Sequence, residues 1–390
     1  MSESPLFSPF VVAGAQLANR VVMAPMTRSR ATRDGDVSPF AAQYYAQRAS
    51  AGLIVTEAIG IGPQAHGYPY TPGLWSAQQS AGWKQVTQAV HERGGRIAAQ
   101  LWHVGRIFSR DNNPLGLDAV GPSAVAADGK IYTPAGWQDL PVPRELTAAE
   151  VRATVEDFAA TAGRALDAGF DAVELHAANG YLIEQFVSDD ANRRGDAYGG
   201  SERKRLTFLA EILDAVSDRC GGLGRIGVRV SPHGDFNGIR HSDPGRVMKD
   251  VVALLAGRRI GFLHVMEPEV SGDGSRSTAK AGGGGDVLAA IRETYPGVLI
   301  AAGGYERARA QAALRSKRAD LIAFGRPFIS NPDLVARMRK DAPLSPWDRR
   351  TFYTRGPAGY VDYPDLEGRV DQTYAPPSPQ KSKEATAWHS

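Results

Sequence analysis

The 390-residue sequence is poor in cysteine and in long apolar runs, and each shortage excludes a class of protein. Its one cysteine, Cys220, excludes internal disulfides, zinc sites built from cysteines and cysteine-ligated iron–sulfur centres. No run approaches the roughly 18 apolar residues that a membrane helix needs. Residues 1–5 lack the charged and apolar regions of a signal peptide. We therefore expect a cytoplasmic protein that does not enter a membrane.

An excess of charge of one sign is also missing. Lysine and arginine number 45 against 42 acidic residues, so the net charge is only +3, and the two signs are interspersed. Proteins that bind nucleic acid instead cluster their basic residues on one surface. Hydrophobic residues make up 43% and charged residues 22%, which is typical of a globular enzyme with a large core. We expect small-molecule partners, no nucleic acid and no metal site, with monomer and homodimer equally open.

Short apolar runs recur along the chain, and each precedes a polar or glycine-rich loop and then a helical pattern. The apolar runs predict strands at residues 21–24, 53–56, 97–101, 172–175, 226–230, 262–265, 298–301 and 321–324. The helical patterns lie at residues 40–50, 76–92, 148–168, 201–219, 243–255, 285–294 and 307–317. Eight strands alternating with helices predict an α/β fold, the (β/α)8 TIM barrel, ahead of a doubly wound sheet.

Two segments depart from this alternation. Residues 108–144, after the third strand, are rich in glycine, proline and aromatic residues and show no helical period. We expect them to form a capping insertion, or lid, over the mouth of the barrel, with a decorative surface loop as the alternative. The tail, residues 366–390, is proline-rich and polar from about Ala375, where we expect disorder to begin. Residues 1–365 then form a single barrel domain.

A histidine, an amide and a phenol follow the fourth strand, at the end of a barrel where enzymes place their chemistry. His176 and Asn179 are three positions apart, so a single helical turn would bring both to one face. Both can donate hydrogen bonds to one carbonyl oxygen and stabilise negative charge there. Tyr181, protonated near neutral pH, can donate a proton. The alternative is a polar turn that only caps the strand.

Glycines follow the seventh and eighth strands, at Gly303 and Gly304 and again at Gly325, where Arg326 comes next. In many barrels the loops after these two strands bind a phosphate. Glycines let backbone amides approach phosphate oxygens, and an arginine adds a cationic fork. The pattern predicts a phosphorylated cofactor or substrate.

Further polar residues at strand ends suggest a flat, redox-active cofactor. Arg229 alternates with apolar neighbours in the fifth strand, so it should point into the barrel and need an anionic or strongly polar partner. The pyrimidine edge of a flavin is one such partner, which Gln100 could also bind, while Thr27 could tune the flavin potential. A salt bridge to Glu174 is the alternative for Arg229.

Several motifs occur in order along the chain: residues 25–28 (PMTR), 100–106 (QLWHVGR), 176–182 (HAANGYL), 185–186 (QF), 192–194 (NRR), 198–201 (YGGS) and 324–328 (FGRPF). Together they resemble the old yellow enzyme family of FMN-dependent ene-reductases. The resemblance extends from about residue 6 to residue 365 and implies a (β/α)8 barrel with bound FMN. It also implies reduction of activated alkenes at the expense of NADPH or NADH.

The resemblance assigns a role to each motif residue. Those around the flavin ring would be Pro25, Met26, Thr27, Ala58, Gln100 and Arg229, and those at its phosphate Gly303, Gly304, Gly325 and Arg326. His176 and Asn179 would bind the substrate oxygen, and Tyr181 would be the proton donor. The aromatic residues of the mouth would be Tyr68, Trp102, Phe236 and Tyr353. Met26 and Thr27 stand where one branch of the family has a cysteine, so this chain resembles the branch without it.

The reaction expected from the resemblance has two halves. NAD(P)H reduces FMN, and hydride then passes to the β carbon of an enone, enal, maleimide or nitroalkene while Tyr181 protonates the α carbon. A phosphate-handling isomerase or aldolase on the same barrel is a rival, but it would need a lysine or an acidic base at a strand end. A ligand-binding sensor that has lost turnover is a second rival. The physiological substrate, the stereochemical preference and the choice between NADPH and NADH stay open.

Overall fold

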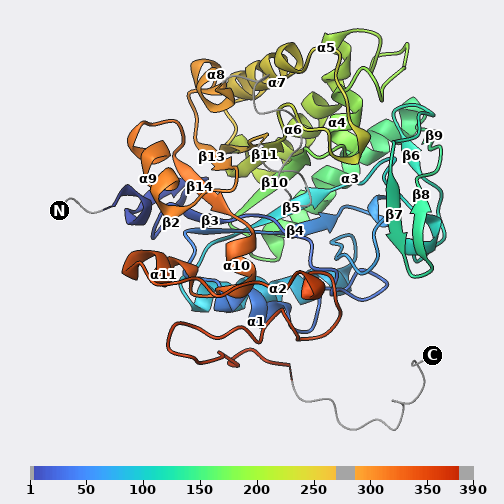
Figure 1. Ribbon diagram of the computed structural model, residues 1–390. Helices are drawn as coiled ribbons and strands as arrows, with labels where there is room; N and C mark the ends of the chain where they lie inside the picture. Colours follow the sequence, from blue (N-terminus) through green and yellow to red (C-terminus); the bar gives the residue numbers. More distant parts are fainter. Residues whose placement is uncertain (1–3, 269–285, 377–390) are drawn as a thin grey trace, which may run out of the picture.

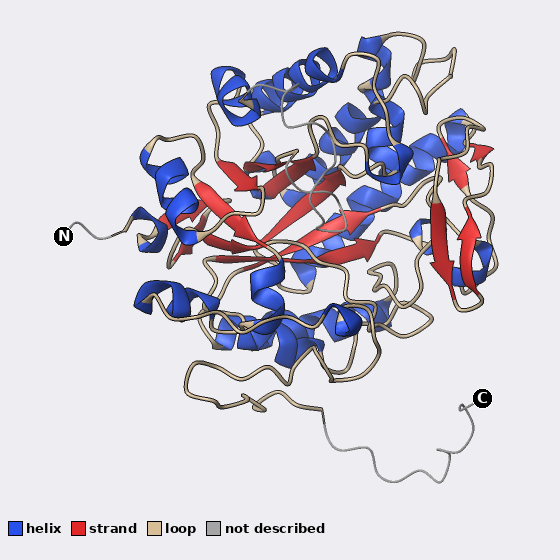
Figure 2. Ribbon diagram, in the orientation of Figure 1, coloured by secondary structure: helices blue, strands red, loops and turns tan. Residues whose placement is uncertain are grey.

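The computed structural model describes residues 4–268 and 286–376 of the chain. Eight parallel strands close into a barrel in the order β10-β11-β12-β13-β14-β3-β4-β5, with helices around it (Figures 1 and 2). The strands are β3 (Val21–Met23), β4 (Leu53–Gly60), β5 (Ile97–Trp102), β10 (Ala172–Ala177), β11 (Ile226–Val230), β12 (Phe262–Met266), β13 (Leu299–Ala302) and β14 (Leu321–Phe324). Every residue in them is buried, as parallel strands covered on both faces require. The predicted (β/α)8 barrel is confirmed.

The helices pack their apolar faces on the outside of the barrel. They are α1 (Ala41–Gln47), α2 (Ala77–Glu92), α3 (Ala148–Asp167), α4 (Leu182–Val187), α5 (Glu202–Arg205), α6 (Thr207–Cys220), α7 (Pro244–Arg258), α8 (Val287–Thr294), α9 (Arg307–Arg315), α10 (Arg326–Ser330) and α11 (Leu334–Lys340). The helix predicted at 201–219 is two helices, because the backbone N–H of Leu206 bonds to Arg203 three residues back and interrupts the α-helical pattern. Among the described residues, no helix has the length and apolar character to cross a bilayer.

Strand β4 is longer than the strand predicted at 53–56. The strand continues through Glu57, whose carboxylate is buried and accepts a hydrogen bond from the backbone N–H of Arg28 (3.2 Å). The backbone N–H of Glu57 in turn donates to the Tyr45 hydroxyl (3.0 Å). Pairing with β5 shifts register between Val55 and Ala58. The irregularity carries the strand on to Gly60 and brings Ala58 beside Gln100 of β5.

Short strands outside the barrel form two antiparallel hairpins and one parallel pair. Hairpin β1 (Phe10–Val12) and β2 (Ala15–Leu17) packs Val12 and Leu17 on residues at the beginnings of the barrel strands. In the insertion after β5, β7 (Lys130–Thr133) and β8 (Gly136–Asp139) form a second hairpin beside the barrel (Figure 1). β6 (Val120–Gly121) and β9 (Arg144–Glu145) join the two ends of that insertion.

The C-terminal segment returns to the loop between β3 and α1. The guanidinium of Arg28 donates to the backbone carbonyls of Phe352 (3.2 Å) and Gly359 (2.8 Å). Arg30 donates in the same way to the carbonyls of Thr351 and Ala358, both at 2.8 Å. These buried arginines are therefore satisfied by backbone that lies more than three hundred positions away in the sequence.

The chain after residue 359 continues along α1 and α2. The backbone carbonyl of Asp371 accepts hydrogen bonds from Gln43 (2.9 Å) and Gln47 (2.8 Å) of α1, and the Tyr374 hydroxyl bonds to Glu92 of α2 (2.6 Å). The disorder predicted from about residue 375 falls almost entirely on residues outside the described part of the chain, which ends at residue 376.

Candidate active site

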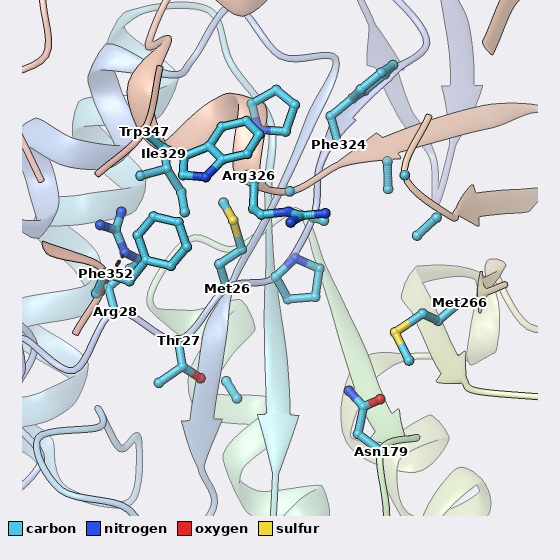
Figure 3. A pocket seen from close by; sticks show the side chains of 18 of the residues that line it. Met26, Thr27, Arg28, Asn179, Met266, Phe324, Arg326, Ile329, Trp347 and Phe352 are labelled. Carbon is cyan, nitrogen blue, oxygen red and sulfur yellow. Dashed lines mark hydrogen bonds between the residues drawn. The ribbon is translucent and has the colours of Figure 1, made fainter. Parts of the chain in front are cut away.

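A cavity of about 2740 Å³ opens at the carboxyl ends of the barrel strands (Figure 3). Parallel strands all end at this rim, so residues distant in the sequence meet there. The predicted residues that line it are Pro25, Met26, Thr27, Ala58, Tyr68, Gln100, Trp102, His176, Asn179, Tyr181, Arg229, Phe236, Gly303, Gly304, Gly325, Arg326 and Tyr353. The structure therefore brings together every side chain and glycine that the sequence suggested for the site.

The turn that carries Asn179 and Tyr181 is not the helical turn expected from sequence. His176 still belongs to β10, and the chain reverses through Asn179 (φ 60°) and Gly180 (φ 74°) before α4 begins at Leu182. A side chain at Gly180 would meet the carbonyl oxygen of Phe236 at 2.7 Å, so this tight passage requires glycine. The prediction of a helical turn was wrong because the i, i+3 spacing fits a left-handed turn equally well.

Buried polar groups hold this turn in place. The backbone N–H of Asn179 donates to Ser231 Oγ (2.9 Å), and that of Gly180 donates to Glu184 Oε2 (2.7 Å). Asn237 Nδ2 donates to the carbonyl oxygen of Asn179 (2.8 Å). The backbone needs of a left-handed turn are thus satisfied from its outer side, which leaves the Asn179 side chain to the cavity (Figure 3).

His176 and Asn179 present unsatisfied polar atoms in the cavity wall. His176 Nδ1 and Asn179 Oδ1 are buried and lack a hydrogen-bond partner within the residues that the structure describes. Burial first, and then the nearby charge of Arg229, keep the pKa of His176 well below its usual value. The imidazole is therefore neutral at neutral pH and carries one N–H donor. Buried polar atoms without partners are costly in a finished core and indicate a ligand site.

Tyr181 lies against both of its neighbours in the wall. Its ring makes edge-to-face contacts with His176 (4.9 Å between centroids) and Trp102 (5.0 Å). Burial raises the pKa of Tyr181 to about 12, although hydrogen bonding with Tyr68 and Asn237 lowers it in part. The phenol thus keeps its proton across the neutral pH range.

The predicted aromatic residues form the mouth of the cavity. Tyr68 stacks on Trp102 with 5.5 Å between ring centroids, and it contacts the edge of Tyr181 at 6.4 Å. Phe236 belongs to a 3-10 turn, Phe236–Gly238, and Tyr353 is 57% exposed at the rim. Trp102, whose indole N–H lacks a partner in the described structure, and Tyr68 both contact the ring of Tyr181.

Gln100 and Arg229 face the cavity from the interior of the barrel, where two further polar residues support them. Gln100 Nε2 donates to Glu174 Oε1 (2.8 Å), and Glu174 Oε2 bonds to His264 Nδ1 (2.7 Å). His264 Nε2 lies 3.4 Å from Arg229 Nη1. In the described structure Arg229 makes no direct ion pair with Glu174, the alternative considered from sequence; His264 connects the two.

The glycines after β13 and β14 leave open backbone beside a cation. Gly304 has a positive φ of 64°, and a side chain at Gly303 would meet the Glu267 carboxylate at 2.7 Å. Gly325 precedes α10, whose first residue, Arg326, lies 5.4 Å from the ring centre of Trp347 (Figure 3). Glycine backbone, a helix beginning and a guanidinium at one rim fit the phosphate of a cofactor.

Sequence reasoning missed the residues that support the site from behind. His264, Glu184, Ser231 and Asn237 do not belong to the predicted set, and Glu174 was considered only as a salt-bridge partner of Arg229. The signal for His264 was available: it is the one polar residue in the otherwise apolar β12. A polar residue in a fully buried strand needs a partner, and that partner is found only in the folded barrel.

Comparison with known proteins assigns the class. Residues 5–345 match the model of the NADH:flavin oxidoreductase / NADH oxidase family. The chain is 42% identical over 381 residues to 12-oxophytodienoate reductase 1 of Oryza sativa subsp. japonica, a match that covers 95% of this chain and 96% of that protein. The chain therefore belongs to this family of flavin oxidoreductases.

Solved structures agree in fold as well as in sequence. Morphinone reductase in complex with tetrahydroNAD superposes with a TM-score of 0.85 at 43% identity, covering 93% of this chain and 98% of that one. The old yellow enzyme homologue of Zymomonas mobilis gives a TM-score of 0.87 at 42% identity, covering 92% and 99%. The resemblance to the old yellow enzyme family is confirmed, and with it a flavin-dependent oxidoreductase that uses FMN and a nicotinamide reductant.

Proposed function

We propose that the chain is an ene-reductase that reduces carbon–carbon double bonds conjugated to a carbonyl or nitro group. The observation that carries this proposal is the shared cavity wall, where the imidazole of His176 and the amide of Asn179 lie beside the protonated phenol of Tyr181. Enones, enals, maleimides and nitroalkenes have an oxygen for the first two residues and an α carbon for the third.

Two groups of residues would hold FMN. Those for the ring are Pro25, Met26, Thr27, Ala58, Gln100 and Arg229, and those for the phosphate are Gly303, Gly304, Gly325 and Arg326. Arg229 Nε is buried without a partner in the described part of the chain, which supports a polar ligand there. When bound, FMN would supply the hydride chemistry between NAD(P)H and the β carbon of the alkene.

The wall residues would stabilise the charge that develops on the substrate oxygen. As hydride reaches the β carbon, negative charge moves to the carbonyl or nitro oxygen, where His176 and Asn179 donate hydrogen bonds. Both donors are neutral, so neither changes its charge near pH 7. Preorganised donors of this kind are worth about 3 kcal/mol each in the transition state.

Tyr181 would deliver the proton to the α carbon. With its pKa at about 12, the phenol is a poor acid toward water but a sufficient one toward a carbon that carries enolate charge. Tyr68, Trp102, Phe236 and Tyr353 would orient the apolar part of the substrate at the mouth. The order of events thus follows from charge: the proton moves only when the oxygen-bound negative charge has formed.

The visible spectrum of the purified protein, before and after anaerobic addition of NADPH, tests the proposal first. We expect flavin bands that bleach with NADPH and return when cyclohexenone is added. A yellow protein that bleaches but never returns would support a flavin-binding sensor instead. A colourless protein that also fails to bind added FMN would favour an isomerase or aldolase that uses the same rim for a phosphorylated substrate.

A further inference from the structure

We propose that Glu174 and His264 are positioning residues for the flavin site. They would hold Gln100 and Arg229 in the orientations that bind the pyrimidine edge of FMN. The Glu174 carboxylate would also set how strongly the charge of Arg229 favours the reduced cofactor. The inference rests on the proposed assignment of Gln100 and Arg229 to the flavin ring.

Neither positioning residue has any exposed surface, and the four residues lie on consecutive strands of the barrel. β5 carries Gln100, β10 carries Glu174, β11 carries Arg229 and β12 carries His264. Gln100 is opposite Glu174 in the strand register, and Arg229 is opposite His264. A buried carboxylate is costly unless it is paired and hydrogen-bonded, and here each of its oxygens has a partner. Such an arrangement beneath a ligand cavity calls for a reason beyond packing.

Glu174 determines which end of the Gln100 amide faces the cavity. A carboxylate can only accept hydrogen bonds, so the amide nitrogen of Gln100 must point to Glu174 Oε1, at 2.8 Å. The carbonyl oxygen of Gln100 is then left for the cavity that this residue lines. An acceptor there fits the ring N–H of a flavin, whereas a reversed amide would present a donor to it.

His264 links the Glu174 carboxylate to Arg229 through its two ring nitrogens and is itself uncharged. Its Nδ1 bonds to Glu174 Oε2 at 2.7 Å and must carry the ring proton, because the carboxylate can only accept. Burial, with the nearby Arg229 charge, lowers the pKa of His264, so the ring is neutral and Nε2 is an acceptor. That acceptor lies 3.4 Å from Arg229 Nη1. The fork of Arg229 is thereby directed, and its Nε stays unsatisfied in the described structure.

The carboxylate also balances the guanidinium. In a buried site, charges interact more strongly than they do in water. Reduction adds negative charge to a flavin, which a cation beside the pyrimidine edge stabilises and an anion behind that cation opposes. Removal of the Glu174 charge therefore should make bound FMN easier to reduce.

The substitution Glu174→Gln tests the charge. We expect the midpoint potential of bound FMN to rise so that the reduced form is favoured at least tenfold relative to the parent, which is about 30 mV for two electrons. Asp171→Asn is the matched control, a carboxylate-to-amide change just before the same strand, where Asp171 accepts from the backbone N–H of Ile97. It should leave the potential unchanged. An unchanged or lowered potential in Glu174→Gln would overturn the inference.

Substitutions of His264 test the orientation and stay informative if Glu174→Gln does not fold. His264→Leu removes both hydrogen bonds without a change of charge, and we expect FMN affinity to fall at least tenfold, measured by quenching of flavin fluorescence in the apoprotein. His264→Gln can again donate to Glu174 and accept from Arg229, so its affinity should lie within threefold of the parent. Equal affinities in the parent and His264→Leu would contradict a positioning role, as would a Gln variant as weak as the Leu variant.

The two proposals fail in different ways. A parent protein that binds no FMN would reject the proposed function itself. A parent protein that binds FMN and reduces enones, together with variants that match its flavin midpoint potential and its FMN affinity, would reject only the roles of Glu174 and His264.

Discussion

The phenol of Tyr181 is a weaker acid in this protein than in water, because burial raises its pKa to about 12. We expect Tyr181→Phe to leave reduction of FMN by NADPH nearly intact and to slow the reaction with an enone by about 10²- to 10⁴-fold, the usual contribution of a proton donor. Stopped-flow absorbance of the flavin resolves the two halves. Tyr374→Phe is the control, because its hydroxyl bonds to Glu92 of α2 and it does not line the cavity. Equal slowing of both halves would show that Tyr181 has another role.

His176 provides a second test at the same scale. A phenol bound against the flavin needs a donor for its oxygen, and we expect His176→Ala to abolish the charge-transfer absorption of the phenol complex. The loss of one preorganised donor should also lower kcat for enones by about 10²- to 10³-fold. A charge-transfer band of full strength in this variant would place the oxygen site elsewhere.

Residue types at strand ends could be predicted from the sequence because they interrupt apolar runs. The predicted strand-end residues line one cavity, from Pro25 after β3 to Arg326 after β14, together with the mouth aromatic residues assigned by resemblance. His264 could not be assigned in this way, because its role depends on a carboxylate 90 positions earlier in the chain. Contacts of that kind are set by barrel closure and strand register, which local patterns do not contain.

The junction between β10 and α4 acts as one element. Its left-handed turn depends on Glu184, which accepts from the Gly180 N–H and from the Ser231 hydroxyl. We expect Glu184→Ala to cost about 1–3 kcal/mol of unfolding free energy, because buried donors lose their acceptor. It should also raise KM for enones, since the turn that carries Asn179 loses the acceptor of the Gly180 N–H and of the Ser231 hydroxyl. Urea titration and steady-state kinetics check both, with exposed Glu156→Ala of α3 as the control.

A variant with normal stability and raised KM would indicate that the turn shifts without unfolding. Normal values of both quantities would contradict the role assigned to Glu184.

Element boundaries were the less predictable part of the fold. β4 extends through Glu57 beyond the predicted end at Thr56, and Leu206 divides a predicted helix in two. In each case a tertiary hydrogen bond or a change of local bonding pattern decides the boundary.

Across the whole molecule, buried histidines make stability depend on pH. Burial lowers the pKa of His66 to about 4, and neither ring nitrogen has a partner in the described structure. The unfolded chain, with a His pKa near 6.5, therefore binds a proton more readily, and stability falls as pH drops below about 6.5. His66 alone should lower the free energy of unfolding by on the order of 3 kcal/mol as the pH falls from about 6.5 to 4.

We expect His66→Phe to make the loss of stability toward acid shallower than in the parent. Glu57 works in the opposite sense: burial raises its pKa to about 7, so its contribution is largest at low pH and is lost as pH rises through that value. Glu57 contributes equally in the variant and the parent, so its contribution cancels when their free energies of unfolding are subtracted. Urea titrations at pH 7 and pH 5 measure it, and parallel pH profiles would contradict the assignment to His66.

Arg28 and Arg30, in the loop after β3, donate hydrogen bonds to the C-terminal segment, and this has a consequence for synthesis of the chain. A ribosome adds residues in order, so all eight strands are complete by Phe324, yet the carbonyls that satisfy Arg28 and Arg30 arrive only with residues 351–359. Until then these two guanidinium groups lack their partners in the C-terminal segment, and Arg28 keeps only the Tyr44 hydroxyl among its hydrogen-bond acceptors. The part of the barrel domain that completes the cofactor cavity is thus among the last to be translated. A nascent chain halted before residue 349 would contain the residues at Met26 and Thr27 without the hydrogen bonds from Arg28 and Arg30 to the C-terminal segment.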